Sequence, residues 1–296
     1  MLRINEDNIP QNYELFRQKT KDNKSFAVTG LTSVLRLFLL SKIKNYSKKK
    51  VLFITSTEQN ALKYQSDLIS GFDLKAFVMP FQNISMYETV SPNLYDYSEQ
   101  IQILNTKPDI VICPVKALLE KFPNADFFKK NSLKIKIGDT LDLKKFARRL
   151  IDLGYKKSTM VSDVSEFSIR GDIADIYSLN ENPVRIELWG DEVVDIRYFD
   201  NETQKSIEKA KETTIMPVYK FITAGQEELV KEIQSRINDI DDEIPEENYF
   251  EGIEVYQNFF NKHLVSILDY FKDYTIVFDE TSEIYSKYEF LDKNLQ

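Results

Sequence analysis

Residues 166–199 read EFSIRGDIADIYSLNENPVRIELWGDEVVDIRYF, and this stretch decides the fold of the middle of the chain. Apolar and polar residues alternate in it with a period of two, which is typical of strands that bury one face. In 184–189 the first, third and fifth residues are apolar, and the others are arginine, glutamate and tryptophan. Glycine, asparagine and proline interrupt the pattern at turns. We therefore predict an antiparallel sheet with strands at 159–161, 166–170, 172–177, 184–189 and 193–199.

A helical pattern precedes these strands. Residues 141–154 read LDLKKFARRLIDLG, with apolar residues at helical spacing and Gly154 where the helix should stop. One helix and several short strands indicate a small antiparallel α+β domain over residues 122–216. We expect this domain to be inserted into a different, α/β layout on either side.

The first part of the chain, residues 1–121, alternates short apolar runs with helical patterns, which indicates βαβ units and a parallel sheet. The predicted strands are SFAVTG (25–30), VLFITS (51–56), KAFVMP (75–80) and DIVICPV (109–115), and the predicted helices are 31–46 and 58–69. The first strand, 26–29, runs into a helix through Gly30. Open α/β sheets place phosphate-binding loops at such a position.

The last part, residues 217–296, is acidic and mostly helical. It contains helical patterns at 226–239 and 257–271, an acidic loop at 239–247 to which we assign no role, and the strand YTIVFDE at 274–280. We expect this strand to return to the first sheet, so that an α/β core is split in sequence. The chain ends on charged sequence without a stop signal, and we therefore expect a fragment of a longer protein.

The composition describes a folded protein. Of the 296 residues 42% are apolar and 12% aromatic, so there is ample material for buried cores. No apolar run reaches the roughly 18 residues of a membrane-spanning helix, and the N-terminus lacks an apolar signal segment. The single cysteine, Cys113, excludes a disulfide framework and a cysteine-based zinc site. We expect a cytoplasmic protein that does not bind a membrane.

The net charge of −8 is unevenly distributed. Residues 1–121 carry +4, residues 122–216 carry −1 and residues 217–296 carry −11. No part has the strongly basic balance of a stand-alone nucleic-acid-binding protein, and the acidic last part would repel phosphates. We therefore expect weak DNA binding or none. A repair module that binds DNA through the +4 first part stays open as an alternative.

The loop after the first predicted strand lacks the chemistry of a P-loop. That motif reads G-x-x-x-x-G-K-[ST], in which backbone amides and the lysine hold phosphates and the hydroxyl binds Mg²⁺. Ala27 and Thr32 replace the two glycines. Ser33 replaces the lysine, Val34 replaces the Mg²⁺ ligand, and Gly30 stays as an interior position. We predict a degenerate site with no hydrolysis, no catalytic residue and no cofactor.

Asp279 and Glu280 end the last predicted strand, where a Walker B strand carries carboxylates that bind metal and activate water. Two acidic residues at a strand end also occur without any such site, so both interpretations stay open. One alternative is therefore a nucleotide-binding or weakly hydrolysing module. His263 is the only histidine, which excludes a multi-histidine metal site, and we predict no metal. We expect His263 on the surface of the helix 257–271 and Cys113 as a buried thiol.

The middle of the chain resembles a known family. The stretches FSIRGDIADIY, NPVRIELWGDEVVDIRYFDNETQKSI and MPVYKF carry its patterns R-G-D-x-x-D-I-[FY], V-R-I-E-[FLW]-[FW]-G-D-E-[VI] and T-Q-x-S. The stretch MPFQNISMYETVSPNLYDYSEQIQIL is similar to a further part of it. From about residue 20 to about 285, the chain resembles the UvrB-like N-terminal module of the bacterial transcription-repair coupling factors (Mfd).

The resemblance implies a helicase-like α/β core, built from the first and last parts, with the middle domain inserted. In UvrB this core carries VTGSGKT and IDESH, whereas the same positions here read VTGLTSV and FDETS. UvrB also has a long, tyrosine-rich β-hairpin that clamps damaged DNA. Residues 86–99 are too short for such a hairpin, so damage verification is not expected.

The inserted domain of this family binds UvrA, the damage-recognition ATPase of nucleotide excision repair. Residues of UvrB that contact UvrA fall on Lys157 and Arg170 here, and a further arginine of UvrB is replaced by Ser168. The resemblance implies an adaptor that links UvrA to stalled RNA polymerase, with polymerase contacts and ATP-dependent DNA translocation in other domains of the full-length coupling factor. Arg170 suits this role because a guanidinium can bind a carboxylate with two parallel hydrogen bonds.

Phe167, Tyr177 and Trp189 complete the predicted partner-binding set. Phe167 and Tyr177 could instead be core residues. Trp189 falls on the polar face of its strand, where exposed aromatic residues favour interfaces, although it could pack under the Pro183 loop.

The two basic residues also have structural alternatives. Arg170 could bridge Asp172 or Asp175 within the sheet, and Lys157 could be an ordinary solvated charge.

Overall fold

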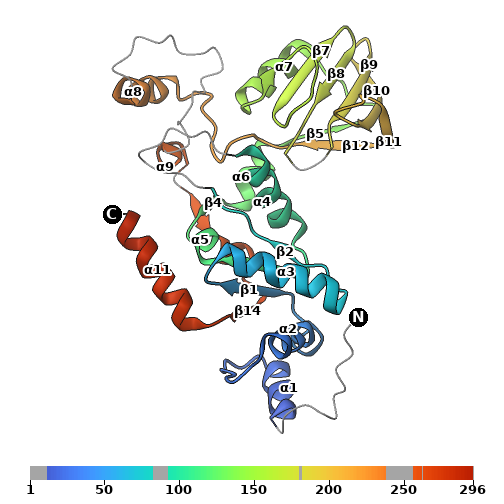
Figure 1. Cartoon of the computed structure of the whole chain (residues 1–296). Helices are drawn as coiled ribbons and strands as arrows, with labels where there is room; N and C mark the ends of the chain where they lie inside the picture. The colour runs from blue at the N-terminus through green and yellow to red at the C-terminus, as the bar shows by residue number, and fades with distance from the viewer. Residues whose placement is uncertain (1–11, 83–92, 180–181, 238–255, 262, 296) are drawn as a thin grey trace. The chain divides into compact units, whose positions relative to one another are not determined.

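The computed structural model describes residues 12–82, 93–179, 182–237, 256–261 and 263–295 (Figure 1). Contacts divide the chain into two compact units. Unit 1 comprises Met1–Phe81, Ile103–Glu120 and Ser266–Gln296, and unit 2 comprises Gln82–Gln102 and Lys121–Val265. Each unit has its own core. The predicted three-part division at 121 and 216 stays a prediction.

Unit 1 is built on a four-stranded parallel sheet in the order β14-β1-β3-β2. The strands are β1 (Val51–Thr55), β2 (Phe77–Val78), β3 (Ile110–Pro114) and β14 (Thr275–Phe278). Every residue of β1 and β3 is buried, as expected for apolar strands covered on both faces of a parallel sheet. β14 pairs with β1 from Val51 opposite Thr275 to Ile54 opposite Phe278, so the predicted return of this strand to the first sheet is confirmed.

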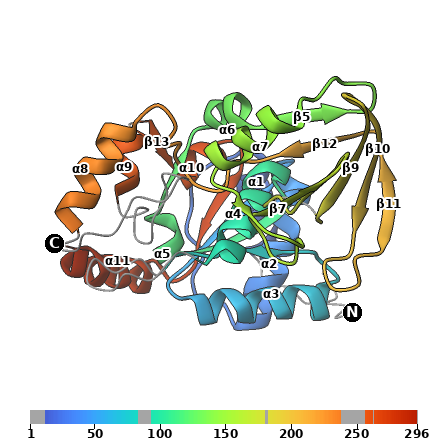
Figure 2. The same ribbon diagram turned by 90° about the horizontal axis from the view of Figure 1, so that it is seen from above.

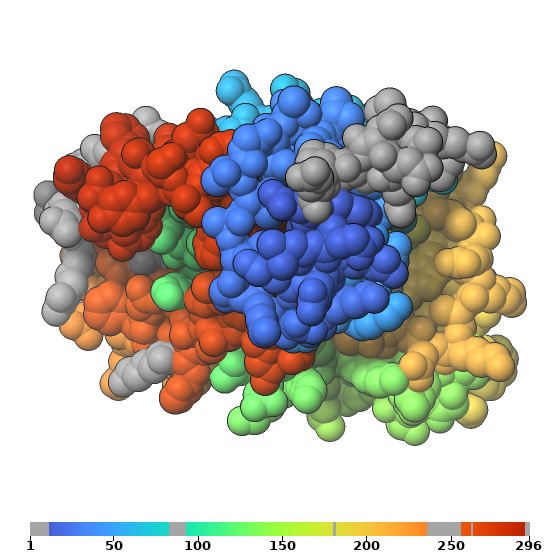
Figure 3. Space-filling model, turned by 90° about the horizontal axis from the view of Figure 1, so that it is seen from below, coloured from blue at the N-terminus to red at the C-terminus, as the bar shows by residue number. Residues whose placement is uncertain are grey.

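Helices cover the sheet of unit 1. They are α1 (Tyr13–Lys21), α2 (Ser33–Ser47), α3 (Glu58–Phe72), α5 (Val115–Leu118), α10 (Ile267–Tyr270) and α11 (Thr281–Leu295). The predicted helices 31–46 and 58–69 are thus confirmed. Thr32 and Thr57 cap α2 and α3 by accepting backbone N–H groups, as N-cap threonines do. On the face seen in Figure 3, the N-terminal helices (blue) lie beside the C-terminal part of the same unit (red).

The predicted strand at 26–29 is wrong. These residues form no strand and belong to no sheet. Asn23 and Gly30, on either side of them, have positive φ angles of 51° and 73°. Phe26 packs edge-on against Phe16 of α1, with ring centroids 5.8 Å apart. A run of four residues is too short to fix a strand by itself, and packing against α1 competes with pairing.

Unit 2 contains a six-stranded sheet in the order β11-β10-β9-β8-β7-β6. The strands are β6 (Lys156–Lys157), β7 (Glu166–Arg170), β8 (Ile173–Ile176), β9 (Val184–Trp189), β10 (Glu192–Phe199) and β11 (Ser206–Ala210). β7 to β11 are antiparallel neighbours, whereas β6 runs parallel to β7. Figure 2 shows β9, β10 and β11 side by side. The four predicted strands from 166 to 199 are confirmed.

The predicted strand at 159–161 is wrong, since the chain pairs as a strand only at Lys156–Lys157 and then forms a loop. β11 was not predicted. A two-stranded sheet of β5 (Leu133–Lys136) and β12 (Glu212–Ile215) was not predicted either.

One face of the six-stranded sheet is covered by α7 (Leu143–Asp152), which confirms the predicted helix at 141–154 (Figure 1). Phe146 and Leu150 of α7 share a core cluster with the apolar side chains of β7 to β10. Val184, Ile186 and Leu188 are buried in that cluster, whereas Arg185, Glu187 and Trp189 alternate with them on the other face. The alternation predicted from the sequence is therefore confirmed, and it leaves one polar face open.

The remaining helices and strands are α4 (Leu94–Thr106), β4 (Lys121–Pro123), α6 (Ala125–Asn131), α8 (Glu227–Ile237), α9 (Gln257–Phe260) and β13 (Leu264–Ser266). α8 confirms the helical pattern at 226–239 as far as Ile237. The single helix predicted at 257–271 is wrong, because α9, β13 and α10 divide this stretch. Asn261 is extended and ends α9, and Ser266 with Asp269 forms a capping box that starts α10.

Two predictions concern segments outside the described residues. The acidic loop at 239–247 lies wholly outside them, and residues 86–99 lie partly outside. Among the residues that the structure does describe, no helix is both long and apolar enough to span a membrane.

Candidate functional site

An arginine occupies the acidic end of the parallel sheet in unit 1. The Arg36 Nη1 lies 2.7 Å from Asp279 Oδ1 and donates a hydrogen bond to the Tyr64 hydroxyl at 2.9 Å. The Tyr64 hydroxyl in turn donates to Asp279 Oδ2 at 2.8 Å. Arg36 Nη2 also pairs with Glu280. One guanidinium from α2 therefore pairs with both carboxylates that follow β14.

Burial controls the protonation of this cluster. Desolvation raises the pKa of Asp279, although the hydrogen bond from Tyr64 and the charge of Arg36 act in the opposite direction. Desolvation, together with the hydrogen bond to Asp279, raises the pKa of Tyr64 to about 12, so the phenol stays a donor at neutral pH. Arg36 provides the positive charge that a buried carboxylate needs.

The other residues of the predicted degenerate nucleotide site lie around the start of α2. Gly30 has a φ of 73°, Thr32 caps the helix, and Ser33 and Val34 form its exposed first turn. The segment 23–31 and β14 both line a cavity of about 780 Å³, together with Arg36, Asp279 and Glu280. No lysine stands at the P-loop position, and the carboxylates already face an arginine.

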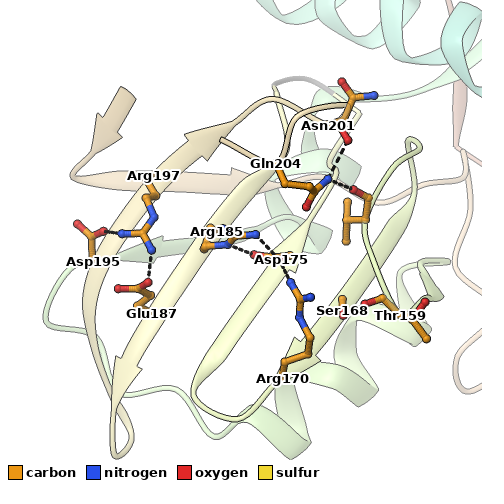
Figure 4. A network of polar contacts seen from close by, with 11 residues as sticks. Thr159, Ser168, Arg170, Asp175, Arg185, Glu187, Asp195, Arg197, Asn201 and Gln204 are labelled. Carbon is orange, nitrogen blue, oxygen red and sulfur yellow. Dashed lines mark hydrogen bonds and ion pairs between the residues drawn. The ribbon is translucent and has the colours of Figure 1, made fainter. Parts of the chain in front are cut away.

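The open face of the six-stranded sheet in unit 2 is organised around Asp175 of β8 (Figure 4). Asp175 is fully buried. It accepts two hydrogen bonds from Arg185 of β9, at 2.7 Å from Nε and 2.9 Å from Nη2. Arg170 Nη2 of β7 donates a third at 2.8 Å. The hydrogen bond to Asp175 is the main cause of the raised pKa of Arg185. Two charge-assisted bonds from one fork hold this pair in a fixed geometry.

The polar network continues across the sheet toward β11. Arg197 of β10 pairs with Glu187 of β9 and with Asp195, whose Oδ2 lies 2.8 Å from Nη1. Lys209 of β11 reaches Asp195 Oδ1 at 3.2 Å. Positive and negative groups therefore alternate along the face, and two of its cations, Arg170 and Lys209, are largely exposed.

Arg170 and Trp189 both lie on this open face. The Arg170 side chain pairs with Asp175, as the structural alternative anticipated, yet it is 54% exposed. Trp189 continues the alternation of Arg185 and Glu187 and is 82% exposed. The alternative that Trp189 packs under the Pro183 loop is therefore wrong.

Two aromatic residues of the predicted partner-binding set are placed elsewhere. Phe167 is fully buried in the core between the sheet and α7, so it cannot touch a partner in this structure. Tyr177 is half-buried against the cluster of Tyr97, Ile101 and Val164, and burial raises its pKa. Their core alternatives describe the structure better, because strand alternation turns Phe167 away from the face that carries Arg170.

Lys157 and Arg170 are not brought onto the same face. Lys157 stands in register with Phe167, and Lys156 stands in register with Glu166. Side chains of partners in register point to the same side of a sheet. Lys156 therefore shares the open face with Arg170, whereas Lys157 lies at the edge on the α7 side. Sequence reasoning missed Lys156, because only the strand register shows which of the two adjacent lysines lies on the open face.

The remaining candidate groups do not form a site. His263 is exposed in the segment between α9 and β13, so its predicted helical position is wrong. Cys113 is a buried thiol, and burial strongly raises its pKa. Within the described part of the chain, no group of three or more histidine, cysteine, aspartate or glutamate side chains is arranged to hold a metal ion.

Comparison with known proteins agrees with this geometry. Residues 133–221 match the family model described as the UvrB interaction domain. This range contains α7 and the whole six-stranded sheet. The chain thus contains an interaction domain of the UvrB type.

The similarity extends beyond that domain. The chain is 32% identical to the transcription-repair-coupling factor of Bacillus subtilis (strain 168), over 91% of this chain and 25% of that protein. It is 28% identical to the transcription-repair-coupling factors of Staphylococcus aureus (strain bovine RF122 / ET3-1) and Staphylococcus haemolyticus (strain JCSC1435), over 87% and 88% of this chain. The chain is a UvrB-homology module of the transcription-repair-coupling factor family. It spans about a quarter of the length of these relatives.

Proposed function

We propose that this chain is a non-catalytic adaptor module that binds UvrA through the open polar face of the six-stranded sheet. The match of residues 133–221 to the UvrB interaction domain carries the proposal. Within this range, the face not covered by α7 exposes a preoriented arginine and a tryptophan, two residue types that dominate binding hot spots.

The geometry of Arg170 allows its guanidinium to bind Asp175 and a carboxylate of the partner at the same time. Its contact with Asp175 uses one of the five N–H donors of the guanidinium. Other donors can therefore bind an acidic side chain of the partner. Because Asp175 already fixes the side chain, little rotamer freedom would be lost on binding.

The similarity to longer coupling factors supports a wider role for this module. We propose that it works in transcription-coupled nucleotide excision repair and that contacts with RNA polymerase lie in other domains of a full-length coupling factor. ATP-dependent DNA translocation would lie in those domains as well.

The proposal is tested by measuring the affinity of this chain for purified UvrA by biolayer interferometry. Arg170→Ala should weaken binding by roughly tenfold, because hot-spot arginines contribute at least that much. Lys134→Ala is a matched control, since Lys134 has a 53% exposed side chain and pairs with Glu212 on a different sheet. If wild type does not bind, the partner is wrong. If Arg170→Ala and Lys134→Ala bind like wild type, the face is wrong.

A nucleotide-binding module is the alternative function, supported by Gly30 and the pair of Asp279 and Glu280. Arg36 argues against it, because it occupies the position of a cation at both carboxylates. Calorimetric titration with Mg²⁺ and ATP separates the two functions. We expect no heat of binding, and micromolar affinity would favour the alternative.

A further inference from the structure

The loop Ser158–Ser162 is fixed by its surroundings to an unusual degree. Four consecutive carbonyl groups each accept a hydrogen bond from a side chain. The donors are Ser168 Oγ to Thr159 (3.2 Å), Ser158 Oγ to Met160 (2.7 Å), Gln204 Nε2 to Val161 (2.9 Å) and Asn201 Nδ2 to Ser162 (3.0 Å). Carbonyl groups of surface loops are usually hydrogen-bonded to water. Here side chains bind them instead, which favours a single conformation of the loop backbone.

Both ends of the loop are held as well. The Ser158 amide donates to the carbonyl of Phe167 at 2.8 Å. At the other end, the amides of Ser162 and Asp163 both donate to Glu166 Oε2, at 2.9 and 3.0 Å. Val161 is fully buried and anchors the loop in the unit.

Gln204 and Asn201 reach the loop from the turn between β10 and β11. Figure 4 shows the side chain of Gln204 in this contact. β6 and β11 are the two outermost strands of the sheet, so these contacts join the loop after one edge strand to the turn before the other. Hydrogen bonds within the turn define its conformation. Asp200 Oδ1 accepts from the Thr203 amide and hydroxyl, both at 2.7 Å, and Gln204 has a φ of 58°. The stretch Thr203–Gln204 of the T-Q-x-S pattern thereby has a structural role.

The fixed loop exposes one large apolar side chain. Met160 is 51% exposed, whereas its neighbour Val161 is fully buried. Thr159, one residue away, is tied to Ser168, which lies on β7 two residues before Arg170 on the same face. The loop therefore borders the open face beside Arg170. Methionine is enriched in protein interfaces, and its flexible thioether adapts to irregular pockets.

We infer that the loop Ser158–Ser162 is a preformed recognition loop that presents Met160 to an apolar pocket of the protein partner, next to a carboxylate that receives Arg170. Gln204 and Asn201 are positioning residues in this inference, and they act through Met160 without touching the partner. The inference rests on the proposed function. It adds two claims to that function. Met160 contacts the partner, and Gln204 lowers the conformational entropy that the loop would lose on binding.

A double-mutant cycle with purified UvrA tests the inference. Met160→Ala should weaken binding roughly tenfold, and Gln204→Glu, which cannot donate to the Val161 carbonyl, should weaken it by a similar factor. Combined in one chain, the two changes should weaken binding by much less than the product of both factors, because Gln204 acts through Met160. Ile207→Ala, which removes another apolar side chain that is 55% exposed, should bind like wild type.

Amide exchange in the free protein provides the second readout. Residues 158–163 should exchange faster in Gln204→Glu while β8 and β9 keep their protection, which separates loosening of the loop from unfolding. If wild-type protein binds UvrA and Met160→Ala binds equally well, the inference is wrong and the proposed function stands. If the factors by which Gln204→Glu and Met160→Ala weaken binding multiply in full in the double variant, Gln204 does not act through Met160. If wild type does not bind, the proposed function fails together with the inference.

Discussion

Arg36 Nη1 lies 2.7 Å from Asp279 Oδ1, so that a helix near the start of the chain is tied to the end of its last strand. The side chain of Asp279 is 4% exposed and that of Arg36 is 21% exposed. A buried carboxylate that loses its counter-charge is costly, because desolvation is no longer offset by attraction. The pair is therefore a structural link between α2 and β14 as well as an obstacle to cation binding.

Arg36→Met should destabilise unit 1 by about 3 kcal/mol, as is typical when one partner of a buried ion pair is removed. The free energy of opening of β14, measured by native-state amide exchange, reports this change. Lys44→Met is the control on the same helix, since Lys44 pairs with Asp109 and both side chains are about half exposed. It should cost less than about 1 kcal/mol. Equal effects of the two substitutions would show that the Arg36 pair is not energetically special.

Asp175→Asn should destabilise unit 2 by about 3 kcal/mol. Two arginines, Arg185 and Arg170, lose the charge of a fully buried carboxylate at once. Amide exchange in β8 and β9 measures the effect. Asp195→Asn on the same face should cost less, because the Asp195 side chain is 17% exposed and Arg197 keeps its pairing with Glu187. A larger cost for Asp195→Asn would mean that the network is not centred on Asp175.

The comparison of sequence with structure shows where local patterns suffice. Alternation in residues 166–199 defined β7 to β10 and their buried face, because burial of one face allows only one register. The run at 26–29 has the same composition as a strand, but the packing of Phe26 on Phe16 was invisible to a local pattern. The capping box at Ser266 and Asp269 was visible in the sequence as S-x-x-D, and it marks the division of the predicted helix at 257–271.

The candidate sites depend on contacts that a single sequence does not reveal. Arg36 and Asp279 lie in different parts of the chain, and only the return of β14 to the sheet brings them together. Gln204 meets Val161 because the sheet and its loops place two distant turns side by side. Arg170 could be named as a partner-binding candidate from the family pattern. Whether it contacts Asp172 or Asp175 could not be decided from the sequence, because the strand register determines it.

Trp189→Ala should change the stability of unit 2 by less than about 0.5 kcal/mol, because an 82% exposed side chain makes few contacts in the folded state. The same substitution should weaken binding to UvrA by roughly tenfold if the tryptophan is a hot spot of the open face. Thermal unfolding and biolayer interferometry measure the two effects separately. Unchanged affinity in a folded variant would place Trp189 outside the interface.

Lys156→Ala should weaken binding to UvrA more than Lys157→Ala. Register with Glu166 puts Lys156 on the open face, and register with Phe167 puts Lys157 on the α7 side. The two variants are matched in residue type, exposure and strand, so their difference isolates the face. We expect a difference of roughly threefold to tenfold, as for a rim charge that steers association, and a smaller difference in 0.5 M salt. A larger effect of Lys157→Ala would mean that the partner approaches over the edge next to α7.

Asp200 makes the turn that carries Gln204 sensitive to acid. The hydrogen bonds from the Thr203 hydroxyl and amide lower the pKa of Asp200. A carboxylate with a lowered pKa in the folded state stabilises the fold above its unfolded pKa of about 3.9, and this contribution is lost as the pH falls through the folded pKa. Wild type should therefore unfold at a higher temperature than Asp200→Asn at pH 7, and the difference should shrink as the pH is lowered below the ordinary aspartate range. Asp273→Asn, at an exposed position in unit 1, is the control at pH 7 for loss of one surface carboxylate. A difference between wild type and Asp200→Asn that stays constant from pH 7 to the acid limit would mean that the charge of Asp200 does not hold the turn.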